Sequence, residues 1–306
     1  MDKSNKTILV TGATGRQGGA VVRHLLKKKW SVKALTRNPN SPSAKSLSNE
    51  GVEVVEGNME DVESLIIAMA STYGVFSVQE YWKSGVTGEI QQGKNMADAA
   101  KRSNVKHFVY SSVGGAERNS GIDHFESKFI IEKYIRKINL PATILRPVSF
   151  MENYYIPIVE KGIIKGKLVD PIHPDRNIQQ IATDDIGAFA ALAFEKPGEF
   201  LNVAIEIAGD QFTNPEAAEI FTKVLGRKVR YKRLPMFIVK YFLGKESFQM
   251  FSWFNSDGYK SDIKYLRSNY PEVKLTTLED WLIKEGWDKK TKYVRHEKTW
   301  DLKSPK

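Results

Sequence analysis

The sequence predicts an α/β protein in which a doubly wound parallel sheet is followed by a smaller region of mixed elements. Over the first 150 residues, short runs rich in β-branched residues alternate with segments whose apolar positions recur at helical spacing, as in βαβ units. A glycine-rich turn, "GATGRQG", directly follows the first of these runs. Beyond Pro147 the alternation ends. These three observations place the parallel sheet in the first half of the chain.

The expected elements follow one another along the chain. Strands are predicted at 7–11, 31–36, 52–56, 74–79, 106–112 and 142–147, where apolar and β-branched residues run together. Helices are predicted between them at 19–30, 61–70 with Asp61 as N-cap, 89–103 and 124–138. Later come a helix at about 183–195, a strand at about 203–208 and a helix at 214–225, in which Asn214 caps and Pro215 takes the first position. The Gly-rich stretch 113–123 is a candidate active-site flap.

Length and composition limit the class of protein. The 306 residues suit about two domains, which we expect at 1–150 and 151–306. The chain has no cysteine, which excludes disulfides, thiolate metal sites and a cysteine nucleophile. Its five histidines are scattered, so no metal site is expected. With no apolar run near the roughly 20 residues that span a bilayer and no signal-peptide pattern, we expect a cytoplasmic protein without a membrane partner.

The net charge of +10 is uneven, because most of the positive excess lies beyond Gly226. A basic region can attract nucleic acid, membranes or acidic partners. Here both signs are interspersed and no helix-turn-helix signature is present. We interpret the region as a solvated surface and expect no direct nucleic-acid partner.

The glycine loop carries the first functional signal. Gly12, Gly15 and Gly18 allow a tight turn, a close approach of backbone to a pyrophosphate, and packing of the next helix on the sheet. The loop follows a strand and opens an amphipathic helix. This context favours a Rossmann-type dinucleotide site over a glycine-rich loop without a ligand.

The end of the second strand indicates which dinucleotide binds. NAD sites usually carry an acidic residue there for the ribose hydroxyls. This chain has "ALTRNPN", in which Arg37 can hold a 2′-phosphate, and Arg16 of the glycine loop can add to that pocket. Arg37 is otherwise a solvated loop arginine. The sequence favours NADP(H) as cofactor.

Several segments together resemble the NmrA-like branch of the atypical short-chain dehydrogenase/reductases. They are "ILVTGATGRQGGAVVRHLL", "TRNP", "VFSVQEYW", "FVYSSV", "HFESK" and "ILRPVSFMENYY", in this order over roughly residues 6–235. The resemblance implies a Rossmann-type domain, NADP(H), and a smaller split α+β substrate region from which parts of the chain return to the first domain. Some such proteins are reductases of quinones, dyes or phenylpropanoid ethers. Others are non-catalytic redox sensors or transcriptional co-regulators.

The resemblance also implies which residues contact the cofactor. They lie in the glycine loop, after the second, third and fourth strands, in two helices and beyond the sixth strand: Thr11, Gly12, Ala13, Thr14, Gly15, Arg16, Gln17, Gly18, Arg37, Asn58, Met59, Gln79, Tyr81, Lys94, Lys128, Phe150, Met151, Glu152 and Asn153.

A candidate catalytic set follows from the same likeness. Short-chain dehydrogenases typically use a serine and a YxxxK pair, in which tyrosine transfers the proton. Here Lys128 is present, His124 takes the tyrosine position, and Ser112, at the end of the fifth strand, takes the serine position. Either His124 is the acid, or Lys128 is, or Lys128 only binds the cofactor and His124 is structural. We expect hydride transfer from NADPH to a small aromatic or quinone-like acceptor. The alternative is a non-catalytic NADP(H) sensor with a regulatory protein partner.

Two aromatic segments, "SFMENYY" and "YFLGKESFQMFSWF", can either line an apolar pocket for such an acceptor or form core. Tyr81 and Trp82 follow the fourth strand, at the edge where ligands bind in these folds.

Overall fold

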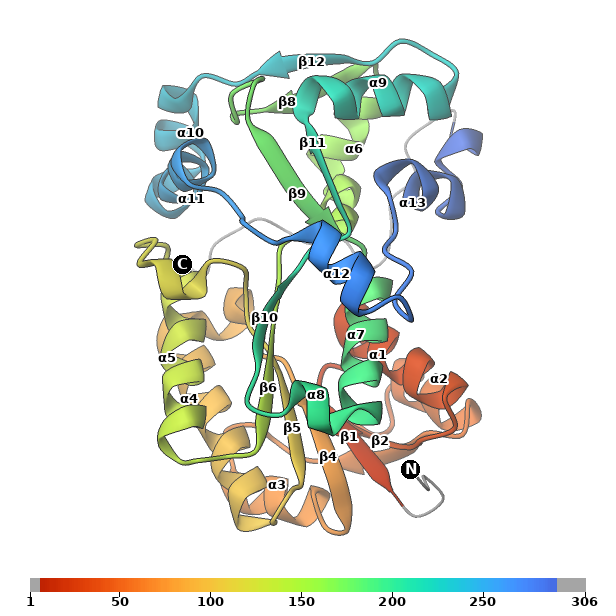
Figure 1. The fold of residues 1–306 in the computed structure, drawn as a ribbon, viewed down its shortest axis with the longest axis vertical. Helices are drawn as coiled ribbons and strands as arrows, with labels where there is room; N and C mark the ends of the chain where they lie inside the picture. The colour runs from red at the N-terminus through yellow and green to blue at the C-terminus, as the bar shows by residue number, and fades with distance from the viewer. Residues whose placement is uncertain (1–5, 291–306) are drawn as a thin grey trace.

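The computed structural model describes residues 6–290 (Figure 1). Its main element is a parallel sheet of seven strands in the order β10-β6-β5-β4-β1-β2-β3. The strands are β1 (Thr7–Val10), β2 (Ser31–Thr36), β3 (Glu53–Glu56), β4 (Thr72–Ser77), β5 (His107–Ser111), β6 (Ala142–Pro147) and β10 (Ala204–Ile207). The order reverses between β1 and β4, which is the point where doubly wound sheets bind ligands. The predicted α/β Rossmann-type fold is confirmed.

The strand positions were predictable because each is a short apolar run. The strands at 31–36 and 142–147 agree residue for residue, and the others differ by one or two residues at their ends. The strand expected at about 203–208 is β10, which returns late in the chain to the edge of the sheet beside β6.

Helices cover both faces of the sheet (Figure 1). One face carries α1 (Arg16–Lys27) and α7 (Thr183–Glu195), which approach so closely that a Cβ on Gly187 would lie 2.6 Å from the Ala20 backbone. The other carries α3 (Val62–Ala68), α4 (Tyr81–Arg102) and α5 (Asp123–Lys137). Two separate hydrophobic clusters fill the two sides, with Phe189 in one and Phe108 in the other. Burial on both faces explains the nearly continuous apolar strands.

Some helix boundaries differ from the predictions. The α4 helix begins at Tyr81 instead of residue 89, because a turn of helix precedes a break at Gly85, where φ is 66° and ψ is −177°. Helix α2 (Pro42–Asn49), capped by Ser41, was not predicted from its serine-rich sequence. Asp61 caps α3 as expected.

The helix expected at 214–225 is α9 (Asn214–Leu225), but its cap was wrong. Thr213 is the N-cap and forms a capping box with Glu216, which places Asn214 inside the first turn. The Asn214 side chain donates instead to Asp170 over 3.1 Å.

The remaining elements form a smaller part of the molecule above the main sheet in Figure 1. Its sheets are β11-β9-β7 and β12-β8. The strands are β7 (Ser149–Phe150), β8 (Lys167–Asp170), β9 (Asn177–Ile181), β11 (Asp210–Thr213) and β12 (Arg230–Arg233). The helices are α6 (Pro157–Ile164), α10 (Met236–Phe242), α11 (Gly244–Ser256), α12 (Ile263–Asn269) and α13 (Leu278–Lys284), while α8 (Pro197–Phe200) leads back into β10. Strand β6 runs into β7, so the carboxyl ends of the main sheet face this smaller part.

The later aromatic residues divide between core and surface, since Tyr241 and Phe242 are exposed. Tyr154 and Tyr155 pack with Trp281 and Trp287 in a third hydrophobic cluster, and Trp253 packs against Phe125 in a fourth. Of the two interpretations of "SFMENYY" and "YFLGKESFQMFSWF", core packing holds for these residues.

The stretch 113–123 is packed against its neighbours. A Cβ on Gly115 would lie 2.7 Å from the Trp253 ring, and Arg118 forms an ion pair with Glu206 of β10 at 3.1 Å. In the described part of the chain, no helix is long and apolar enough to cross a membrane, and no three acidic or histidine side chains gather as metal ligands would.

Candidate functional site

The glycine loop is shaped by close backbone contacts. The Thr11 hydroxyl ties the ends of β1 and β4 together, since it donates to the Val78 carbonyl at 3.0 Å and accepts from the Val78 N–H at 2.8 Å. Gly12 has a φ of 60°, and the Gly15 N–H donates to its carbonyl at 2.8 Å. A Cβ on Gly18 would lie 2.2 Å from that carbonyl oxygen. The positive φ at Gly12 and the close approach at Gly18 both require glycine.

The amino end of α1 suits an anion. Its N-cap, Gly15, supplies no side-chain hydrogen bond, and no acidic residue lies in the first turn. The first N–H groups of a helix lack intrahelical partners and sit at the positive end of the helix dipole. The loop and helix therefore fit a dinucleotide pyrophosphate.

A second observation also fits a bound ligand. The Oε1 of Gln79, just after β4, is buried and has no hydrogen-bond partner within residues 6–290, while its Nε2 donates to Ser77 at 2.9 Å. Buried polar atoms are rarely left unpaired. Nearby, the Asn58 side chain closes its own turn by accepting the Glu60 N–H at 3.1 Å, and the Met59 carbonyl accepts from Asn95 at 2.8 Å.

The two arginines expected in one pocket have different surroundings. Arg37 directly follows β2, is exposed, and forms no ion pair with any described residue. Arg16 instead donates to the Glu152 carbonyl at 3.0 Å and lies 6.0 Å from the Tyr155 ring. Burial lowers the pKa of Arg16. In the structure Arg16 is held by the segment after β7, and its expected contribution to the Arg37 pocket stays a prediction.

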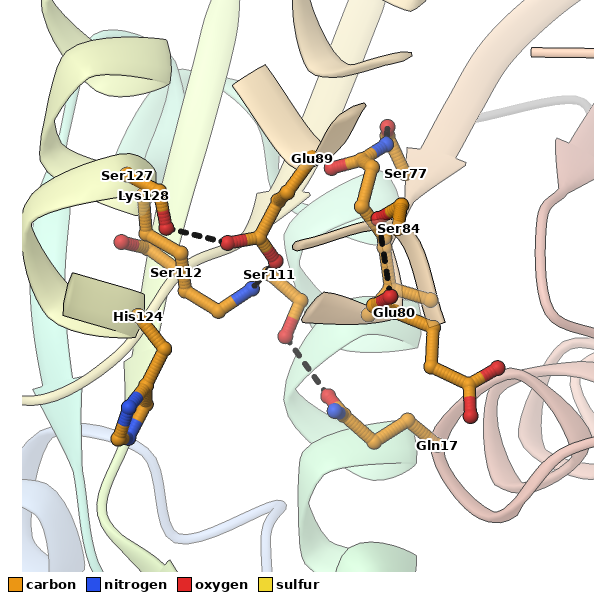
Figure 2. Close-up of polar contacts among 12 residues, drawn as sticks. Gln17, Ser77, Glu80, Ser84, Glu89, Ser111, Ser112, His124, Ser127 and Lys128 are labelled. Carbon is orange, nitrogen blue, oxygen red and sulfur yellow. Dashed lines mark hydrogen bonds and ion pairs between the residues drawn. The ribbon is translucent and has the colours of Figure 1, made fainter. Parts of the chain in front are cut away.

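Lys128 is paired with a glutamate that the sequence analysis missed (Figure 2). Its Nζ lies 2.7 Å from Oε1 of Glu89, and the Ser127 hydroxyl donates to the other carboxylate oxygen. The Glu89 side chain has no solvent exposure. Its position on α4 is in register with the buried Gly93, Met96 and Ala100. The sequence therefore offered one signal for Glu89, namely a charged residue among the apolar positions of a helix.

His124 has a different set of partners from Lys128. Its Nδ1 lies 2.8 Å from Oε1 of Glu246 on α11. The rings of Tyr81, Trp82 and Phe125 surround the imidazole, with centroids 5.4, 5.6 and 4.9 Å away. Figure 2 shows the ring turned away from the Lys128 amine. The two residues share one helix face but do not act on each other directly.

Glu246 is held as a carboxylate. Burial by itself would raise its pKa, but the hydrogen bond and charge of His124 and the hydroxyl of Tyr81 outweigh burial, and the pKa is lowered. The pKa of Tyr81 is raised by burial and by the neighbouring Glu246, so its hydroxyl keeps its proton. Glu246 was not singled out from the sequence, because it lies 122 residues from His124.

The serine expected in the catalytic set is turned away. The Ser112 hydroxyl donates at 2.6 Å to Glu132, a buried carboxylate that also binds Arg146 at 2.7 Å. It is Ser111 that faces the glycine loop, donating to Gln17 at 2.7 Å (Figure 2). Successive side chains leave a strand on opposite faces, so a one-residue difference decides which serine reaches the site. A catalytic role for Ser112 is not supported by this geometry.

The segment after β7 serves mainly the fold. Met151 is fully buried in the third hydrophobic cluster. The Glu152 carboxylate accepts the N–H and hydroxyl of Thr183 at 3.0 and 2.8 Å and the Trp281 Nε1–H at 3.3 Å. Asn153 donates to Ser149 at 3.2 Å. These side chains are engaged within the fold, and the cofactor contacts expected of Met151, Glu152 and Asn153 stay predictions.

Lys94 and Phe150 lie at the margins of the expected site. The Lys94 amine sits 5.4 Å from the Tyr134 ring, between α4 and α5, and its expected cofactor contact stays a prediction. Phe150 is half-buried against the hydrophobic cluster on the α1 side. All the expected cofactor contacts, including those of Ala13 and Thr14, stay predictions.

The comparisons with known proteins agree with this geometry. The model of the NmrA-like family matches residues 4–282. An NmrA-like family domain-containing protein of Dictyostelium discoideum is 29% identical over 92% of this chain and 98% of its own length. An NAD(P)H azoreductase of Xenophilus azovorans is 30% identical over 73% of this chain and 76% of its own. The triphenylmethane reductase of Citrobacter sp., solved with NADP(H), is similar over 91% of this chain and 99% of its own, at 25% identity and a TM-score of 0.77. The chain belongs to the NmrA-like family and has the fold of its NAD(P)-binding oxidoreductases.

Proposed function

We propose that this protein is an NADPH-dependent reductase of a small aromatic or quinone-like acceptor. The observation that carries the proposal is a histidine, His124, set among the rings of Tyr81, Trp82 and Phe125 beside Lys128. This cluster follows the carboxyl end of β4, next to the point where the strand order reverses. Ligands bind at that edge in doubly wound sheets.

Different residues hold the different parts of the cofactor. The glycine loop and the start of α1 receive the pyrophosphate, and Arg37 receives the 2′-phosphate. Lys128, already positioned by Glu89, holds the nicotinamide ribose. The cofactor domain then comprises the main sheet and its helices within residues 6–150, to which α7 and β10 return, and the other later segments complete the acceptor side. When bound, NADPH supplies a hydride, that is, two electrons and one hydrogen.

The acceptor class is supported by the ring wall. Tyr81 and Trp82 offer flat apolar surface with polar edges, which suits planar aromatic molecules. Relatives are named as an azoreductase and a triphenylmethane reductase, names that refer to aromatic compounds.

The test is a screen of NADPH oxidation with quinones, azo dyes and triphenylmethane dyes. We expect turnover with at least one class, faster with NADPH than with NADH, and a loss of turnover in His124→Ala. His173→Ala is a matched control, since the half-buried His173 pairs with Asp175 instead. Tight NADPH binding without turnover of any acceptor would reject the reductase.

A second candidate is a non-catalytic NADP(H) sensor that acts through a protein partner. Two observations favour it: histidine occupies the position of the usual proton-donating tyrosine, and the charge of Lys128 is already matched by Glu89. The same screen decides between the candidates, because a sensor binds the cofactor and oxidises none of it.

A further inference from the structure

We propose that Glu246 is a positioning residue, which fixes the imidazole of His124 so that its Nε2 delivers a proton to the acceptor. The inference rests on the proposed reductase function. It adds a residue from α11 to a site otherwise built from β-strand ends, α4 and α5.

The contact is specific to one ring nitrogen. Glu246 Oε1 lies 2.8 Å from His124 Nδ1, and no described residue hydrogen-bonds Nε2. A carboxylate only accepts hydrogen bonds, so Nδ1 must carry a proton toward it. The second nitrogen, on the other side of the ring, is then left for a substrate. The hydrogen bond at one nitrogen thereby sets the role of the other.

The ring is held in place by its neighbours. Tyr81 and Trp82 come from the first turn of α4, ahead of the break at Gly85, and Phe125 follows His124 on α5. The Tyr81 hydroxyl faces the Glu246 carboxylate, whose charge adds to burial in raising the Tyr81 pKa. Three elements thus fix the plane of the imidazole and the carboxylate together, and this preorganisation is what proton transfer requires.

Two carboxylates lie beside the ring. Glu246 contacts it from α11, and Asp123 precedes it on α5, while the neighbouring Lys128 is paired with Glu89. A carboxylate at one ring nitrogen orients the imidazole for proton transfer at the other, as at other acid–base histidines.

Proton transfer from His124 accompanies hydride transfer to the acceptor. As the acceptor receives the hydride with its two electrons, negative charge develops on an acceptor oxygen or nitrogen. The Nε2–H bond of protonated His124 breaks and its proton bonds to that acceptor atom. The electron pair of the broken bond stays on Nε2. Neutral His124 keeps its Nδ1 proton toward Glu246 and recovers the Nε2 proton from water.

The first test needs no turnover. In cofactor-free protein with ¹⁵N-labelled histidine, at a pH where the ring is neutral, we expect His124 to be the Nδ1–H tautomer. In Glu246→Ala it should shift to Nε2–H. His124→Phe assigns the signal, and Glu219→Gln, an exposed glutamate on α9, is the charge-matched control. An Nε2–H tautomer in the unmodified protein would overturn the proposal, whether or not an acceptor is known.

The second test uses the acceptor found in the screen. General acids contribute on the order of 100-fold, so we expect Glu246→Ala to lower kcat by about 10- to 100-fold, with KM for NADPH unchanged and Glu246→Gln in between. In the His124→Phe background the Glu246 change should add nothing. Additive losses in the double variant, in folded protein with an unshifted melting temperature, would show that Glu246 acts independently of His124 and reject the inference.

Discussion

The Lys128 amine lies 2.7 Å from a carboxylate oxygen of Glu89, whose side chain is completely buried. The pair joins α5 to α4. A buried carboxylate depends on its partner cation, because desolvation is costly without compensation. Lys128 is therefore a structural partner as well as a candidate cofactor contact.

Removal of either member of this pair should destabilise the fold. We expect Lys128→Ala to lower the free energy of unfolding by about 3 kcal/mol, because the buried Glu89 is left unpaired. The double variant with Glu89→Gln should cost less than the sum of the single changes. Urea unfolding measures each value.

The exposed pair Lys83–Glu80, at 2.6 Å, is the control for this cycle. Its removal should cost less than about 1 kcal/mol, as for other surface pairs. Equal costs for the buried and exposed pairs would contradict the assignment.

Arg37→Ala should discriminate between the two nicotinamide cofactors. Loss of a charge-assisted contact to the 2′-phosphate is expected to weaken NADPH by about 10- to 100-fold and to leave NADH nearly unchanged. Titration calorimetry with both cofactors measures this. Arg230→Ala, on the exposed strand β12, is the control, and an equal loss for NADPH and NADH would refute the 2′-phosphate role.

Gly18→Ala should disrupt the glycine loop. Its Cβ would lie 2.2 Å from the Gly12 carbonyl oxygen, a distance that forces the loop backbone to move. We expect loss of the thermal stabilisation that NADPH gives to the unmodified protein. Gly198→Ala, where nothing lies within 4 Å of the new methyl group, should retain it. A Gly18→Ala variant that NADPH still stabilises fully would show that the loop does not hold the cofactor.

Asp185 should make stability depend on pH. Its carboxylate accepts from the Thr276 N–H and hydroxyl at 2.8 and 2.7 Å, and burial raises its pKa to about 6. A folded pKa above the ordinary value means that the group's contribution is fully present below about pH 4 and is lost as pH rises through about 6. Relative to Asp185→Asn, the unmodified protein should lose about 3 kcal/mol over that range.

Chemical unfolding of both proteins from about pH 4 to 7 checks the sign. The neighbouring Asp184 is present in both and largely cancels from the difference. Asp175→Asn, at an exposed site, should track the unmodified protein at every pH. If the difference in unfolding free energy between Asp185→Asn and the unmodified protein stays constant with pH, Asp185 does not titrate in this range.

Much of the fold could be predicted because its signals are local. The strands at 31–36 and 142–147 and the helix at 183–195 have the same bounds in the sequence analysis and in the structure. The errors fall where local patterns are weak or ambiguous. Gly85 and Gly88 hide the early start of α4. The N-cap of α9 is Thr213, one residue before Asn214, which is also a common capping residue.

The sequence by itself determined the parallel α/β architecture, the glycine turn and the adjacent positions of His124 and Lys128, since hydrophobic period, glycine spacing and helical spacing all act within a few residues. Only the tertiary structure decided what each side chain faces. In the structure Lys128 pairs with Glu89, and His124 pairs with Glu246. Ser111 rather than Ser112 donates to Gln17, and Arg16 donates to Glu152. These partners lie 39 to 136 residues apart, and no local period records a contact that forms only when distant elements pack.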